Sequence, residues 1–292
     1  FGESDKIFTK RIKEIIMFKN YIRIAFRNIL RNKVISSINL LGLANGLAVC
    51  LMILLFVKNE WSYDRYNSKA DRTVRVFFEG SIQGEALKEA NVMPPVAATL
   101  LDEFAEVEEA ARLRIAGTPR INYQDESFNT HEVAFVDNSF FSVFDLPWIG
   151  GNKATALVEP NTVVISKVVA QKYFGNMNPI GESLFFKDWN ESFKVTGLIE
   201  EVPENSHFHF DIFTSMAGMP DAKVPSWMVS EFYTYLVLSE GYDYRNLEAK
   251  LPAIFEKYAG PQLQKAMGIT LEDFVGQGNH LALKLQPLTD IH

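Results

Sequence analysis

Three side chains in the string "SHFHFD" are of the types that bind metal ions. His207, His209 and Asp211 alternate with phenylalanines, and side chains two residues apart point to the same side of a β-strand. A zinc site, however, usually needs about four ligands, and the sequence holds no second cluster of His or Cys. The same alternation also describes a strand with one aromatic face. We therefore predict neither a metal nor another cofactor.

Other patterns that would indicate an enzyme are absent from the sequence. There is no G-x-x-x-x-G-K-[ST] loop to cradle phosphates and no G-x-S-x-G nucleophile motif. The single cysteine, Cys50, lies in a long apolar run. The acidic pair Glu108 and Glu109 is expected on the solvated face of a helix. We predict a protein that is not an enzyme and that depends on a separate partner for any energy from ATP.

The charges are distributed unevenly along the chain. The 292 residues carry a net charge of -7, yet residues 1–33 hold nine Lys and Arg against three Asp and Glu, whereas residues 58–292 hold 20 against 33. Nucleic acid attracts basic proteins, so the acidic balance of the larger part argues against a nucleic-acid partner. The sequence predicts a basic arm, 1–33, and an acidic domain on either side of one apolar segment.

Residues 34–57, "VISSINLLGLANGLAVCLMILLFV", contain no charged residue. As a helix they would be about 36 Å long, enough to cross a hydrocarbon core of about 30 Å. A signal peptide would have a shorter apolar region of about 7–15 residues followed by a cleavage site. A core helix of a soluble protein would be expected to carry a charge on an exposed flank. A transmembrane helix is therefore favoured over both alternatives.

Basic residues gather on the N-terminal side of this segment. Arg23, Arg27, Arg31 and Lys33 lie close to it, which predicts a cytoplasmic N-terminus and a large domain outside. The three arginines follow an i, i+4, i+8 spacing, and such a basic face suits an amphipathic helix among the headgroups of membrane lipids. A solvated helix that happens to be basic is the alternative interpretation.

Polar and small residues lie on one face of the apolar segment. Asn39, Gly42, Gly46 and Cys50 are spaced so that they align along a helix. Gly42 and Gly46 form a small-xxx-small pair that lets a second helix approach closely, and Asn39 could hydrogen-bond across the contact. The partner helix would come from further sequence or from another subunit. Alternatively, these glycines reflect only the general frequency of glycine in membrane helices.

The large domain is predicted to contain two strand-helix-strand units. In the first, the strands are 73–80 and 111–117 and the helix is within 93–110. In the second, the strands are 232–241 and 281–288, and the helix, 246–267, is expected to kink at Pro252. Two such units commonly share one sheet with both helices on one face.

The region between the two units has shorter strands and more turns. "EVAFVD" and "SFKVTGLIEEV" are predicted strands, and 167–174 is a helix with Ser166 as N-cap and Gly175 at its end. We predict an α+β protein: one N-terminal transmembrane helix, 34–57, and then a bilobed domain. Residues 58–116 and 229–292 would form the strand-helix-strand subdomain, and 117–228 an inserted, mainly β subdomain.

An ordered series of strings resembles the FtsX-like, MacB-type permeases of ABC transporters, in the form abundant in Bacteroidetes. The resemblance runs from Met17 to His292, and residues 1–16 have no counterpart in it. The strings are "FKNYIRIAFRNILRNKVISSINLLGLANGLA", "NEWSYDRYNSKADRTVRV", "FVDNSFFSVFDLPWIGGN", "NTVVISKVVAQKYFGNMNPIGESL", "VTGLIEEVPENSHFHFD" and "LQPLTDIH".

The resemblance implies a porter-like periplasmic domain with an inserted β part, in the cell inner membrane, in a piece of a longer permease with three further spans. It also implies a second permease subunit and a cytoplasmic ABC ATPase dimer, whose ATP hydrolysis would move the spans and drive export or other handling of envelope substrates. A periplasmic adaptor is an optional partner. The alternative is a single-pass receptor with an extracytoplasmic ligand-binding domain.

The junction that leaves the membrane would experience this motion most directly. Glu60, Asp64 and Arg65 follow the apolar segment, and we predict that they form ion pairs at a hinge. This hypothesis rests on their position in the sequence.

Overall fold

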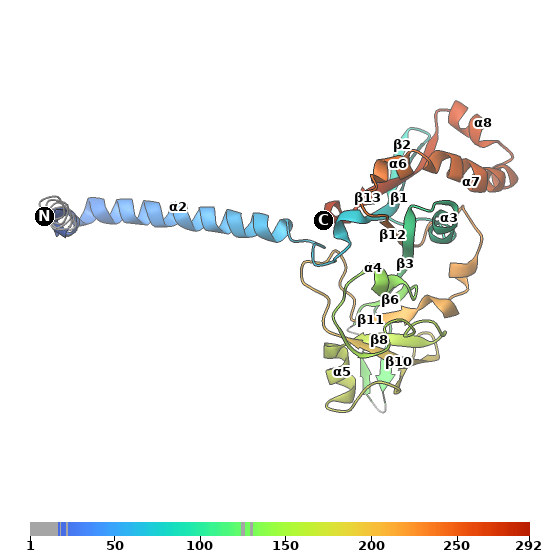
Figure 1. The fold of residues 1–292 in the computed structure, drawn as a ribbon, viewed down its shortest axis with the longest axis horizontal. Coiled ribbons are helices and arrows are strands. Elements are labelled where there is room, and N and C mark those ends of the chain that lie inside the picture. The colour runs from blue at the N-terminus through green and yellow to red at the C-terminus, as the bar shows by residue number, and fades with distance from the viewer. Residues whose placement is uncertain (1–16, 18, 22, 124–125, 129–130) are drawn as a thin grey trace, which may run out of the picture. The chain divides into compact units, whose positions relative to one another are not determined.

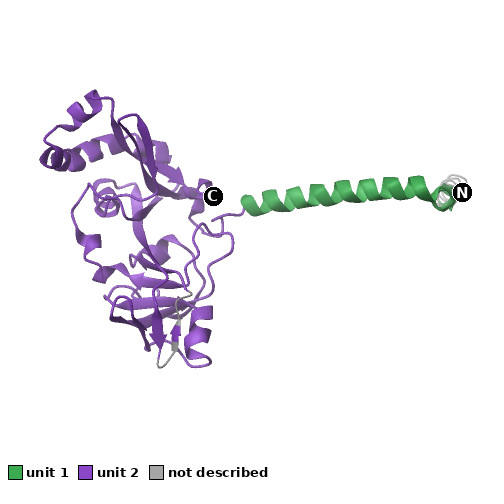
Figure 2. Ribbon diagram, turned by 180° about the vertical axis from the view of Figure 1, so that it is seen from behind, with its two compact units in different colours: residues 1–61 green, residues 62–292 purple. Residues whose placement is uncertain are grey.

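The computed structural model describes residues 17, 19–21, 23–123, 126–128 and 131–292 (Figure 1). The chain divides into two compact units, Phe1–Trp61 and Ser62–His292 (Figure 2). Residues 1–16, which have no counterpart in the family resemblance, lie outside the described residues.

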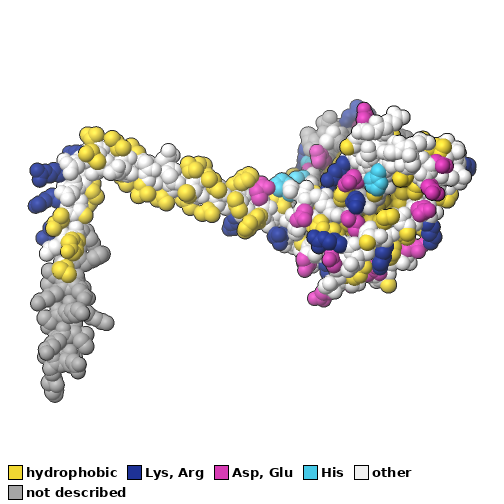
Figure 3. Space-filling model, turned by 90° about the horizontal axis from the view of Figure 1, so that it is seen from above, with side chains coloured by type: hydrophobic (Ala, Val, Ile, Leu, Met, Phe, Trp, Pro, Cys, Tyr) yellow, Lys and Arg dark blue, Asp and Glu magenta, His cyan; other side chains and the backbone are white. Residues whose placement is uncertain are grey.

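The first unit is helical. After the helical residues 23–31, helix α2 extends over Lys33–Glu60 and includes the whole predicted span. None of its residues is buried, and hydrophobic side chains cover its surface (Figure 3). By its length and composition α2 could cross a membrane, and an unburied apolar surface of this extent is what a lipid-facing helix requires.

The second unit is built on one large mixed sheet. Its strands are β1 (Thr73–Ile82), β2 (Glu85–Glu89), β3 (Val107–Gly117), β4 (Ile121–Tyr123), β5 (Glu126–Phe128), β6 (Val133–Val136), β7 (Trp148–Gly151), β8 (Thr162–Ser166), β9 (Ser183–Phe186), β10 (Glu191–Ile199), β11 (Ile212–Ser215), β12 (Tyr233–Leu238) and β13 (His280–Pro287). Its α-helices are α3 (Val96–Glu103), α4 (Phe140–Val143), α5 (Lys167–Phe174), α6 (Tyr244–Glu248), α7 (Leu251–Met267) and α8 (Leu271–Gly276).

The two predicted strand-helix-strand units are interleaved in the sheet. The strand order is β13-β1-β12-β3, and all three neighbouring pairs are antiparallel. Each unit therefore places its two strands parallel to each other with a strand of the other unit between them, which is the split βαβ arrangement. Helices α3 and α7 pack on one face through Val96, Leu100 and Phe255. The α+β class predicted from the sequence is confirmed.

The sheet continues without interruption into the region 117–228. β3 pairs with β6, and the order then runs β6-β11-β8-β10-β9-β4-β5, with β7 beside β10. Helix α5 packs here on a second core through Val169 and Phe174. Ser166 caps this helix by accepting from the N–H of Val169, and Gly175 follows it with φ of 59°, as predicted. The boundaries proposed for an inserted subdomain stay a prediction.

Two helical predictions are corrected by the structure. The helix predicted within 93–110 ends at Glu103, and Glu108 and Glu109 lie in strand β3 instead of on a helix face. The helical spacing of the apolar residues continues to Val107, but pairing of this segment with β12 decides its conformation. Pro252 does not kink a helix either: it lies in the first turn of the new helix α7, a position that proline favours.

A third core lies on the sheet face opposite α3 and α7. Phe140, Phe141 and Phe144, in and after α4, pack there against Phe213 of β11 and Tyr235 of β12. The side chains of both halves of the sheet therefore meet in one cluster. Tyr66, close to the start of the second unit, packs against this cluster.

Candidate functional site at the start of the sheet domain

The segment Ser62–Arg72, called here the exit segment, joins the end of α2 to the first strand of the sheet. Helix α2 ends at Glu60 and β1 begins at Thr73. The exit segment holds a turn and a short 3-10 helix, Ala70–Arg72. Its polar residues make contacts with three separate parts of the second unit.

Asp64 is the most deeply buried of these residues. Its exposed fraction is 0%, and its φ of 57° lies in the left-handed region, which Asp and Asn tolerate better than most residues. Its N–H donates to the carbonyl of Asn205 at 2.8 Å. Its Oδ1 lies 2.8 Å from Nδ1 of His207 and also accepts from the backbone N–H of His207 at 3.3 Å. Asp64 therefore fixes the exit segment to residues 205–207.

The same histidine connects Asp64 to the sheet. His207 is 7% exposed at its side chain, and its Nε2 lies 2.7 Å from the hydroxyl of Tyr235. Burial raises the pKa of Tyr235, so this phenol stays protonated. A carboxylate only accepts, so Nδ1 of His207 donates to Asp64, and the hydroxyl of Tyr235 hydrogen-bonds to Nε2 on the other side of the ring. The three side chains form a continuous hydrogen-bonded chain from the exit segment to β12.

A second set of contacts reaches the α4 region. The amide N–H of Ser68 donates to Oδ2 of Asp145 at 2.6 Å, and the N–H of Asp145 donates to Oδ1 of Asn67 at 2.9 Å. Burial alone would raise the pKa of Asp145, but the hydrogen bonds from Ser68 and two nearby lysines outweigh it and keep this pKa below its ordinary value. A neighbouring contact goes to residues 205–207 instead. Tyr66 donates to Oγ of Ser206 at 3.0 Å, and burial raises the pKa of Tyr66 to about 12.

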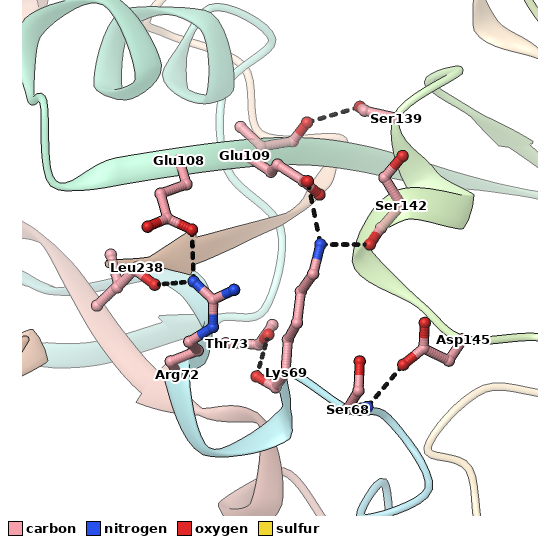
Figure 4. A network of polar contacts seen from close by, with 11 residues as sticks. Ser68, Lys69, Arg72, Thr73, Glu108, Glu109, Ser139, Ser142, Asp145 and Leu238 are labelled. Atoms are coloured by element: carbon pink, nitrogen blue, oxygen red, sulfur yellow. Dashed lines mark hydrogen bonds and ion pairs between the residues drawn. The ribbon is translucent and has the colours of Figure 1, made fainter. Parts of the chain in front are cut away.

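A third set of contacts reaches the sheet (Figure 4). Nζ of Lys69 donates to Glu109 of β3 at 3.0 Å and to the carbonyl of Ser142 at 2.9 Å. Nη1 of Arg72 donates to Glu108 at 2.5 Å and to the carbonyl of Leu238 at 2.7 Å. Single exposed ion pairs stabilise little, but these bonds hold one short segment against two strands and α4. These bonds attach the exit segment to β3, β12 and α4.

The three residues predicted at the junction have different environments. Glu60 is the last residue of α2, Asp64 is buried, and Arg65 is exposed. The side chain of Asp64 contacts His207, at 2.8 Å between Oδ1 and Nδ1. Their role at a hinge stays a prediction. Sequence reasoning missed the contact of Asp64 with His207, because 143 positions separate the two residues and neither has a local signal for it.

The residues of "SHFHFD" do not meet at one point. His207 binds Asp64, His209 is exposed, and Asp211 lies 3.0 Å from Nδ1 of His131. In the described part of the chain, no group of three or more His, Cys, Asp or Glu is placed to hold a metal ion.

The pair of His131 and Asp211 predicts a pH dependence. The hydrogen bond from His131, and after it the charge of His131 and the bond from Ser166, hold the pKa of Asp211 below its ordinary value. A carboxylate with a lowered folded-state pKa stabilises the fold above its unfolded pKa of about 3.9, and this stabilisation is lost as the pH falls through the folded value. We expect Asp211→Asn to lose stability at pH 7 and to show a smaller further loss on acidification. Urea unfolding of both proteins between pH 7 and pH 3 measures the free energy of unfolding. The same dependence on pH in the two proteins would contradict the prediction.

The two predicted faces of the first unit are exposed. Arg23, Arg27 and Arg31 are exposed, as is Lys33 at the start of α2, and dark blue side chains gather at that end of the unit (Figure 3). The aligned residues Asn39, Gly42, Gly46 and Cys50 are also exposed. A Cβ atom added at either glycine would meet no atom within 4 Å. Lipid binding and helix packing at these faces stay predictions.

A comparison with family profiles matches residues 36–254 to the MacB-like periplasmic core domain. The match covers the larger part of the chain, from α2 through the sheet to α7. A search of curated proteins finds no match.

The solved structures that match this chain include three domains of other proteins. A domain described as that of a permease protein from Porphyromonas gingivalis is 23% identical, with a TM-score of 0.65, and the alignment covers 76% of this chain and 91% of that domain. The periplasmic region of MacB from Actinobacillus actinomycetemcomitans is 13% identical, with a TM-score of 0.47 and coverages of 75% and 90%. The extracellular domain of the noncanonic ABC-type transporter YknZ from Gram-positive bacteria is 15% identical, with a TM-score of 0.46 and coverages of 73% and 99%.

Proposed function

Because the chain belongs to the family of proteins with a MacB-like periplasmic core domain, we propose that it is the part of an ABC-transporter permease that carries force from the membrane to the periplasm. In this proposal α2 is the first span, with a cytoplasmic N-terminus in the inner membrane. A separate cytoplasmic ATPase supplies the energy, and a second permease subunit packs against the face of Asn39, Gly42 and Gly46. The basic helix before α2 rests on membrane lipids.

The observation that carries the proposal is the short distance in sequence between α2 and the buried anchor. Helix α2 ends at Glu60, and Asp64 is already fully buried and bonded to His207. Four residues span at most about 14 Å when fully extended. A motion that would take the end of α2 farther than this from Asp64 must therefore move Asp64 or break its contacts.

The contacts of the exit segment spread such a displacement over the second unit. Asp64 pulls on His207, Lys69 on both β3 and α4, and Arg72 on β3 and β12. Since β3 is also the strand that joins the two halves of the sheet, a pull on β3 is transmitted to both halves. The moving domain would then act on the transported substrate, either in export or in another process of the cell envelope.

Lengthening the connection tests this proposal. We expect that six Gly and Ser residues inserted between Trp61 and Ser62, which add about 20 Å of slack, uncouple the sheet domain from ATP. The measurement is the distance between spin labels at S183C in the two protomers of the full permease, assembled with its ATPase and with Cys50 replaced by serine. ATP should change this distance in the parent protein and change it far less in the insertion variant.

The matched control is the same insertion between Asn176 and Met177, in an exposed loop after α5. It should leave the ATP-dependent change intact. An equal change in both insertion variants would show that the domain does not move through the exit segment. The absence of any ATPase that binds the permease would contradict the transporter assignment itself.

A further inference from the structure

A cleft of about 480 Å³ opens on the sheet face opposite α3 and α7. Its floor is formed by β1, β3 and β12, through Arg75, Leu113, Tyr233 and Tyr235, and one wall by residues 207–210. Concave sites of this size, mostly apolar with a few polar groups, are typical of small-molecule binding.

Arg75 gives this cleft an unusual positive charge. Its side chain is partly buried, and its Nη2 donates to Oε1 of Gln286 at 2.7 Å. Its Nε is buried without a hydrogen-bond partner. Across the residues that the structure describes, no carboxylate forms an ion pair with it. A guanidinium that is partly removed from water without a negative partner is costly.

The other partly buried arginines of the second unit do have such partners. Arg72 pairs with Glu108, Arg112 with Asp137, and Arg114 with both Asp221 and Glu231. Each of these partly buried arginines therefore has a carboxylate partner. Arg75 differs from them in having no carboxylate partner among the described residues, and it lines the cleft.

The surroundings of Arg75 define the chemistry that would neutralise it. Ile115 and Ile291 offer apolar contact, and the ring of Tyr233, which is partly exposed, offers a flat surface. We propose that the cleft binds an organic anion with an aromatic or apolar body and a single carboxylate or similar acidic group directed at Arg75. Glu132 also lines the cleft and would repel a ligand with several negative charges.

A ligand in this cleft would contact the attachment of the exit segment. His207 and Tyr235 line the cleft and also hold Asp64 through their hydrogen-bonded chain. Binding of the anion does not depend on whether the domain transmits force, so the two proposals can fail separately.

Photolabelling tests this binding site. The full chain in lipid nanodiscs is irradiated with 4-azidobenzoate, and the labelled peptides are identified by mass spectrometry, with 4-azidobenzamide as the uncharged probe of the same shape. We expect saturable labelling by the carboxylate in peptides that contain Tyr233 or residues 207–210. Labelling by the amide should be at least about tenfold weaker, because the uncharged amide lacks the charge-assisted hydrogen bond to Arg75.

Variants separate the charge of Arg75 from the shape of the cleft. Arg75→Gln should reduce labelling by the carboxylate to the level of the amide, whereas Arg65→Gln, at an exposed arginine, should leave it unchanged. Ile115→Trp, at a residue that is 52% exposed, should block the cleft while Arg75 stays in place, which covers the case in which Arg75→Gln misfolds. Equal labelling by the two probes, labelling that survives both cleft variants, or no saturable labelling would each overturn the proposal.

Discussion

Replacing Asp64 with alanine is expected to lower the free energy of unfolding of the sheet domain by about 3–5 kcal/mol. Asp64 is fully buried, and its Oδ1 binds both the side chain and the backbone N–H of His207. The substitution leaves the buried Nδ1–H of His207 without its acceptor, and alanine also adopts the positive φ of this position less readily than aspartate does. Urea unfolding of the full chain in nanodiscs, followed by tryptophan fluorescence, measures the loss.

The neighbouring Arg65 provides the control for this prediction. Its side chain is exposed, so Arg65→Ala should change the stability by less than about 0.5 kcal/mol. Asp64→Asn keeps an oxygen acceptor and tolerates positive φ, and its loss should lie between the other two. If Asp64→Ala were as stable as Arg65→Ala, the contact with His207 would not be the anchor of the exit segment.

Replacing Phe140 with alanine is expected to cost a similar 3–5 kcal/mol, for a different reason. Phe140 is 0% exposed, and its ring lies 4.7 Å from that of Phe144 and 5.5 Å from those of Phe208 and Phe213. Removing the ring leaves a cavity at the centre of the cluster that joins both halves of the sheet. Thermal or urea unfolding of the full chain measures the change.

An exposed residue again provides the comparison. Val158 is 51% exposed, and Val158→Ala should be nearly neutral, while Phe140→Leu should lose less than Phe140→Ala because it fills part of the cavity. A small effect of Phe140→Ala would mean that this cluster rearranges to close the space and does not hold the halves of the sheet together.

The elements that local patterns determine were predictable from the sequence. The apolar run forms helix α2, as its length and its lack of charged residues predicted. Helix α5 has Ser166 and Gly175 at its two ends, as its sequence predicted. The two strand-helix-strand units were also predictable, since their apolar residues follow the periods of strands and helices. Their interleaving was not predicted, because alternation along a strand does not identify the neighbouring strand.

The candidate site depends on contacts that local patterns do not encode. Asp64 was predicted to form an ion pair at a hinge, and His207 was considered as a metal ligand. The structure places these two side chains in contact with each other. Likewise, the apolar residues from Val96 to Val107 have helical spacing, and only the pairing with β12 shows that the last of them belongs to a strand. Residues that act across long sequence separations need the fold before their roles can be assigned.

The position of β1 in the sheet has a consequence for the biosynthesis of the domain. Val74 pairs with Leu236 on one side and with Pro287 on the other, so the ribosome must complete almost the whole domain before β1 acquires these neighbours. Closing such long loops is entropically costly and slow. Until then Val74, Val76 and Phe78, which are buried in the finished fold, face solvent or a chaperone. The first strand of the sheet therefore gains its two long-range neighbours only when β13, the last strand, has been made.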